Sequence, residues 1–213
     1  NEAYQDVDKL VGEQIQEKVK SFGRYIIQVG RIYPIKNYET TIRALANIAD
    51  KDLKYVIVGP QDHVLGKGNY KDELLSLAKK LGLEDRIIFA GVLRGIDKYY
   101  LIKNAQMMGH MAIWESFCNV VHEGLSQGLV CIVANNTALP FLIKDGVNGY
   151  CVETYDYEGV ANKINYVLEN KTSKEIKKME YQNRIYGLKN SWRSVADTMD
   201  QWFKNNLIQL NTI

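Results

Sequence analysis

Two glutamates, Glu115 and Glu123, stand eight positions apart on either side of a short run of small and polar residues. Asn119 is a suitable N-cap, because its side chain can accept a hydrogen bond from a free amide two or three residues further on. A helix is therefore predicted over 120–127, with the amides of 116–120 exposed at its positive end. Such an end binds phosphate or another anion without a dedicated cation. The stretch predicts an anion site with a carboxylate on each side.

Carboxylates beside an anion site suit a ligand that is more than an anion. An ionised carboxylate only accepts hydrogen bonds and a sugar hydroxyl donates them, so a phosphate flanked by sugars, as in a nucleotide sugar, fits this pattern. Arg31 and Lys36 follow a short apolar run that ends at Gly30. A guanidinium binds phosphate oxygens in a bidentate way and an ammonium acts as a mobile point charge, so the two suit a diphosphate. Taken alone, each is more often a solvated loop residue.

Short apolar runs alternate with helical patterns along the chain, and each candidate loop follows one of the runs. The runs predict buried strands, and about six alternations indicate an α/β fold with a doubly wound parallel sheet, Rossmann-like in form. Ligands of such sheets bind beyond the carboxyl ends of the strands, so the candidate loops are expected to converge there. The predicted strands are 25–29, 54–59, 86–91, 129–134 and 150–152, with another near His110. The predicted helices are 4–22, 38–49, 70–81, 97–103, 141–144, 156–170, 174–186 and 192–207.

The composition excludes several classes of protein. The chain has 213 residues, 46% of them hydrophobic, which is enough for one well-buried domain. Lys and Arg number 27 against 25 Asp and Glu, so no nucleic-acid partner is expected. Three cysteines without metal-ligand spacing indicate reduced thiols and a cytoplasmic protein. No apolar run reaches the roughly 18 residues of a membrane span.

Three motifs in this order have a recognisable pattern: VGRIYPIKN after the first strand, FAGVLR after the third, and the E-x7-E pair. Together they resemble the C-terminal domain of retaining glycosyltransferases of family 4, over residues 24–170. Enzymes of that family have the GT-B fold, which is two Rossmann-like domains with a cleft between them. The resemblance implies a linker helix over 1–23, a nucleotide-sugar-binding domain over 24–190, and a helix over 191–213 that returns toward a missing N-terminal domain. Because the chain starts at Asn1, we expect a fragment.

The resemblance implies a role for each candidate residue. Arg31 and Lys36, beside Gly30, would hold the donor diphosphate and stabilise its charge as the glycosidic bond breaks. Glu115 would contact the donor sugar, and Glu123 would accept hydrogen bonds from the ribose. Glu115, Arg31 and Lys36 are thus the predicted catalytic residues. The backbone of Ser116, Phe117, Cys118, Asn119 and Val120 would contact the phosphate and sugar, and Val92, Leu93 and Arg94 the base.

The sequence departs from the family pattern at two loops. Ser116, Phe117 and Cys118 stand where Gly-Phe-Gly is common, and their Cβ atoms narrow the approach to the backbone. Thr137-Ala138 and Phe141 stand where relatives commonly carry two glycines and a glutamate. These departures motivate a first alternative, a non-catalytic scaffold or binding module. A second alternative is another GT-B enzyme, such as a sugar-nucleotide epimerase or a phosphorylase.

No metal cofactor is expected, because the cations and the helix end suffice for the diphosphate. Of the three histidines, His110 is expected in the core, His122 in packing, and His63 in solvent. The expected partners are a nucleotide-sugar donor and, through the missing domain, an acceptor glycan, lipid or small molecule, so this chain alone would transfer little. The basic segment 171–193 has two interpretations, a solvated helix face first and peripheral contact with an anionic membrane at the cytoplasmic face second.

Overall fold

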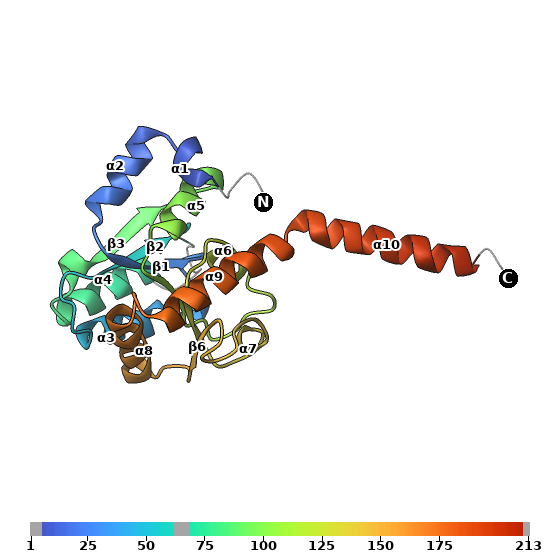
Figure 1. Ribbon diagram of the computed structural model, residues 1–213. Coiled ribbons are helices and arrows are strands. Elements are labelled where there is room, and N and C mark those ends of the chain that lie inside the picture. Colours follow the sequence, from blue (N-terminus) through green and yellow to red (C-terminus); the bar gives the residue numbers. More distant parts are fainter. Residues whose placement is uncertain (1–5, 62–68, 211–213) are drawn as a thin grey trace.

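The computed structural model describes residues 6–61 and 69–210, and for 207–210 it describes the backbone alone. Its centre is a six-stranded sheet in the order β3-β2-β1-β4-β5-β6, and every neighbouring pair is parallel (Figure 1). The doubly wound Rossmann-like fold is therefore confirmed. The strands are β1 (Tyr25–Val29), β2 (Lys54–Val58), β3 (Ile87–Gly91), β4 (Met107–His110), β5 (Cys131–Ala134) and β6 (Gly149–Val152).

Helices pack on both faces of the sheet. On one face α3 contacts both α4 and α8, and α1, α5, α6 and α9 form the layer on the other (Figure 1). The helices are α1 (Val7–Leu10), α2 (Glu13–Ser21), α3 (Tyr38–Ala46), α4 (Tyr70–Lys80), α5 (Gly95–Lys103), α6 (Asn119–Ser126), α7 (Leu139–Leu142), α8 (Tyr157–Glu169), α9 (Lys174–Lys189) and α10 (Trp192–Leu210), with 3-10 turns η2 (Pro34–Lys36) and η3 (Glu84–Arg86).

The central strands are buried on both faces, as their largely apolar sequences predict. Gln28 in β1 differs from the apolar residues around it, because it is polar and yet fully buried. Its amide nitrogen donates to the carbonyl of Lys36 over 3.0 Å, and its amide oxygen accepts from the Tyr55 hydroxyl. The buried amide therefore ties the loop after β1 to the strand beneath it.

The predicted single helix over 4–22 is wrong. The segment forms α1 and α2, and both Val11 and Gly12 between them are extended. Glycine is a poor helix former because it loses the most backbone freedom, so the chain breaks there. The predicted helix 38–49 likewise ends early, at Ala46.

The last helix, α10, projects away from the sheet (Figure 1). Trp192, Met199 and Trp202 lie exposed along it. That it returns toward an N-terminal domain stays a prediction. Among the described residues, none of the helices combines the length and apolarity that crossing a bilayer requires.

The carboxyl ends of β1, β2 and β3 lie very close to one another. A Cβ atom at Gly59 would lie 1.9 Å from the carbonyl oxygen of Gly30, which is closer than two atoms can approach. The Gly59 amide donates to the Gly91 carbonyl over 3.0 Å, and Gly30 donates to Val58 over 2.9 Å. Glycine is thus required at position 59, where the strand ends meet.

Candidate functional site

The candidate loops meet where the strand order changes direction, between β1 and β4. Parallel sheets of this kind bind ligands at that point, beyond the carboxyl ends of the strands. The Ile113 amide donates to the Ile35 carbonyl over 2.8 Å, and the Asn37 side chain donates to the Met111 carbonyl over 2.9 Å. The loops after β1 and β4 are therefore joined directly, as the sequence predicted.

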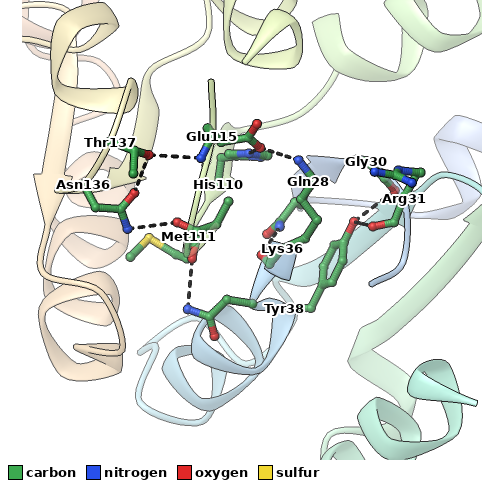
Figure 2. Close-up of polar contacts among 12 residues, drawn as sticks. Gln28, Gly30, Arg31, Lys36, Tyr38, His110, Met111, Glu115, Asn136 and Thr137 are labelled. Atoms are coloured by element: carbon green, nitrogen blue, oxygen red, sulfur yellow. Dashed lines mark hydrogen bonds and ion pairs between the residues drawn. The ribbon is translucent and has the colours of Figure 1, made fainter. Parts of the chain in front are cut away.

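Lys36 and Glu115 form an ion pair across these two loops (Figure 2). The Lys36 ammonium donates to Oε1 of Glu115, and the two side chains are only 17% and 11% exposed. Nε2 of His110 lies 2.7 Å from the same Oε1. Two predicted catalytic residues thus meet, together with a histidine that the sequence assigned to the core.

The partners of Glu115 set its charge. Burial alone raises the pKa of Glu115, but hydrogen bonds from His110 and Lys36 outweigh it and lower the pKa to about 2. Burial disfavours the charged form of His110 as well, which for a histidine lowers the pKa, so its imidazole is neutral near pH 7. Because an ionised carboxylate only accepts, Nε2 of His110 must carry the proton that it donates.

The loop after β5 fixes the backbone of Glu115. The backbone amide of Glu115 donates to Oγ1 of Thr137 over 3.0 Å, and the side-chain amide of Asn136 donates to the Ala112 carbonyl over 3.0 Å (Figure 2). Asn136 also donates to Thr154 in the loop after β6. The substituted Asn-Asn-Thr loop, which the sequence shows only as a departure from the family pattern, therefore holds the backbone of a predicted site residue in place.

Cys118, and not Asn119, is the N-cap of α6, so the predicted cap is wrong. Cys118 has φ +58°, in the left-handed region that glycine adopts most easily. This turn places Asn119 inside the helix, where its side chain is exposed and makes no cap. Burial, together with the Glu115 charge, raises the pKa of the Cys118 thiol to about 12, so it stays protonated.

Glu123 lies one turn into α6 and pairs with a residue of α5. Nζ of Lys98 is 2.6 Å from Oε1 of Glu123, and both side chains are largely buried. The other oxygen, Oε2, is buried and has no hydrogen-bond partner in the described part of the chain. Lys98 was not predicted from the sequence, although it stands one turn after Arg94 in the helix that follows β3.

The residues after β3 enter α5 directly. Val92 and Arg94 are exposed, Leu93 packs partly on the core, and Arg94 is the N-cap residue without a side-chain cap. The Lys98–Glu123 pair joins this helix to α6. The predicted base-binding residues therefore lie just before α5, and the predicted ribose-binding Glu123 is on the neighbouring helix α6.

Arg31 and Gly30 lie at the other end of the loop after β1. The Tyr38 hydroxyl is 3.0 Å from the Gly30 carbonyl oxygen and 3.2 Å from that of Arg31. Figure 2 shows Arg31 beside Gly30, apart from the pair of Lys36 and Glu115. The two predicted diphosphate ligands are on one loop, but only Lys36 contacts Glu115.

The histidine predictions have different outcomes. The ring of His122 stacks on Phe117 at 4.9 Å and on Tyr186 at 6.0 Å between centroids, so its packing role is confirmed. His110 is fully buried, as predicted, but its Nδ1 has no hydrogen-bond partner in the part of the chain described. His63 lies outside the described residues.

Nitrogen, oxygen and sulfur atoms of His110, Glu115 and Cys118 all lie within 4.8 Å of one another. Such a set suits zinc only with a thiolate and a histidine whose second nitrogen is hydrogen-bonded. Here Glu115 already binds the Lys36 ammonium, and Nδ1 has no partner among the described residues. These residues do not fit a metal in this arrangement, and that the protein needs none stays a prediction.

Solved structures share this fold. A glycosyltransferase of Rickettsia africae superimposes with a TM-score of 0.81 at 21% identity, over 96% of this chain and 55% of that one. Anabaena Alr3699/HepE, solved in complex with UDP, superimposes with a TM-score of 0.77 at 24% identity, over 96% and 52% of the two chains. At these identities the similarity establishes the fold alone.

Curated relatives are similar in sequence. The N-acetylgalactosamine-N,N'-diacetylbacillosaminyl-diphospho-undecaprenol 4-alpha-N-acetylgalactosaminyltransferase of Campylobacter jejuni is 31% identical over 162 residues, 75% of this chain and 41% of that protein. A D-inositol 3-phosphate glycosyltransferase of Mycobacterium sp. (strain KMS) is 30% identical over 140 residues, 66% and 31% of the two. The chain spans less than half the length of these relatives.

Residues 13–186 match the family model described as glycosyl transferases group 1. This range includes the sheet, every predicted site residue and most of α9. The predicted membership of a GT-B glycosyltransferase family is thereby confirmed: the chain belongs to the glycosyl transferases of group 1.

Proposed function

We propose that this chain is the donor-binding half of a retaining glycosyltransferase, which moves a sugar from a nucleotide-diphosphate sugar to an acceptor hydroxyl. The observation that carries the proposal is the meeting of Lys36, Glu115 and the first turn of α6 at the point where the strand order reverses. Membership of the group 1 family supports it, and so does the binding of UDP by Anabaena HepE, which has the same fold.

Each part of the site has a task in this proposal. The amides at the start of α6, with Lys36 and Arg31, bind the diphosphate and stabilise the charge that develops as the glycosidic bond breaks. Lys36 then moves from Glu115 to the phosphate, a change that its flexible stem allows. Glu115, freed from that partner, accepts a hydrogen bond from the donor sugar.

The nucleoside lies on the other side of α6. Oε2 of Glu123 is buried and lacks a partner among the described side chains, and a ribose hydroxyl would provide the missing donor. Lys98 holds the opposite oxygen of that carboxylate in place. The base then lies against the residues that follow β3, over 92–94.

Binding is tested by titrating UDP, GDP and ADP and their sugars into the chain. Removal of a charge-assisted phosphate contact costs about 1.5–3 kcal/mol, so Arg31→Ala and Lys36→Ala should each weaken nucleotide diphosphate binding at least about tenfold. Lys79→Ala, an exposed lysine of α4 far along the chain from these loops, is the matched control and should bind as the wild type does.

The non-catalytic scaffold remains the alternative, because Cys118 places a buried side chain where the family pattern has glycine. Failure of every nucleotide to bind at millimolar concentration would favour the scaffold. Conversion of the nucleotide sugar without an acceptor, in the full-length protein, would instead favour an epimerase. For the basic segment 171–193, contact with a membrane stays the second interpretation after a solvated helix face, because Glu180 there already pairs with both Lys171 and Lys177.

A further inference from the structure

His110 is a polar residue at the end of a strand whose other side chains are apolar. Met107, Met108 and the imidazole itself are all 0% exposed. Nδ1 of His110 is buried without a hydrogen-bond partner in the described chain, which makes the imidazole a costlier core residue than leucine. Packing alone therefore does not account for a histidine at this position.

The contact that does account for it is with Glu115. Nε2 lies 2.7 Å from Oε1, and the Lys36 ammonium donates to the same oxygen. Both nitrogen donors therefore bind the same carboxylate oxygen, and neither of these two contacts uses the other oxygen, Oε2. The imidazole is on β4, in the sheet, whereas Lys36 is on a loop.

We propose that His110 is a positioning residue that holds Oε1 of Glu115 while Oε2 accepts a hydrogen bond from the donor sugar. The proposal rests on the proposed function, in which Lys36 leaves Glu115 for the diphosphate. His110 cannot follow, because the sheet fixes its backbone and burial fixes its ring. It therefore keeps the carboxylate oriented at the moment when the sugar has to be recognised.

The test compares His110→Leu, which removes the donor, with His110→Gln, whose amide nitrogen can replace Nε2. UDP is titrated beside UDP-glucose, UDP-N-acetylglucosamine and UDP-N-acetylgalactosamine, to find the gain in affinity that the sugar provides. His110→Leu should reduce that gain about tenfold and change UDP affinity less than about twofold. His110→Gln should restore most of the gain.

A residue with only a structural role would behave differently. Its loss would weaken UDP and UDP-sugar equally, and that result would overturn the proposal. The melting temperature of His110→Leu does not separate the two roles, because the substitution removes both the unpartnered Nδ1 and the hydrogen bond to Glu115. The proposal would also be overturned if the sugar increased the affinity of His110→Leu as much as it increases that of the wild type.

A second readout does not depend on any ligand. The side-chain 15N spectrum of His110 at pH 7 should show a neutral ring with the proton on Nε2, and Glu115→Gln should shift that resonance. A ring protonated on Nδ1 would overturn the proposal even if nucleotides bind. If no nucleotide binds but the Nε2 tautomer is found, the proposed function fails while the contact between His110 and Glu115 stands.

Discussion

Lys98 and Glu123 form an ion pair between α5 and α6, with Nζ 2.6 Å from Oε1 and each side chain about one-fifth exposed. The pair joins the helix that follows β3 to the helix that begins at the candidate phosphate site. Its two residues therefore connect the proposed base-binding and phosphate-binding parts of the site.

A double-mutant cycle measures this connection. Lys98→Met leaves a largely buried carboxylate unpaired, so we expect a loss in the free energy of unfolding of about 1.5–3 kcal/mol. Glu123→Gln with Lys98→Met should cost less than the sum of the single changes, with a coupling energy on the order of 1 kcal/mol. Urea denaturation of the four proteins gives the value, and strict additivity would show that the pair does not stabilise the fold.

Glu115 makes stability depend on pH in a defined window. Its pKa is lowered from 4.5 to about 2 in the folded chain, so its contribution is complete above about pH 4.5 and is lost as the pH falls toward 2. We expect the difference in unfolding free energy between wild type and Glu115→Gln to shrink by about 3 kcal/mol across that window. Denaturation of both proteins from pH 6 to pH 2 checks this. A difference that stays constant contradicts it.

Glycine should be preferred to alanine at position 118. Cys118 has φ +58°, which costs a residue with a Cβ about 1–2 kcal/mol relative to glycine. Cys118→Gly should therefore be more stable than Cys118→Ala by about 1 kcal/mol. Comparison of the two variants with each other removes the effect of losing the thiol.

The matched control is Ser76, an exposed residue inside α4. There the order should reverse, because glycine is about 1 kcal/mol less favourable than alanine within a helix. The same order at both positions would mean that the backbone at residue 118 is not held in the left-handed conformation.

Thr137 should matter through its hydroxyl. Thr137→Val has the same shape but removes the oxygen that accepts from the Glu115 amide, so we expect a loss of about 1 kcal/mol in unfolding free energy. Thr137→Ser keeps the oxygen and should retain most of the stability. If the proposed function holds, Thr137→Val should also reduce the preference for UDP-sugar over UDP. Equal behaviour of the valine and serine variants would show that the hydroxyl is not the cause.

The fold was predictable because strand and helix alternate and because the strands are short and largely apolar. The convergence of Lys36 and Glu115 followed from the rule that loops after parallel strands share one edge. The roles of His110, Thr137 and Lys98 did not follow, because each depends on a partner that only the folded chain brings near. The cap at Cys118 was missed because side-chain preference favours Asn119, whereas the cysteine there adopts a backbone conformation typical of glycine.

The close approach at Gly59 limits how this protein can diversify. A single methyl group at that position would overlap the Gly30 carbonyl, so no larger residue fits at position 59 unless the backbone of Gly30 moves. Gly30 opens the loop that carries Arg31 and Lys36, so a backbone movement that made room for a larger residue at position 59 would also displace these two candidate ligands.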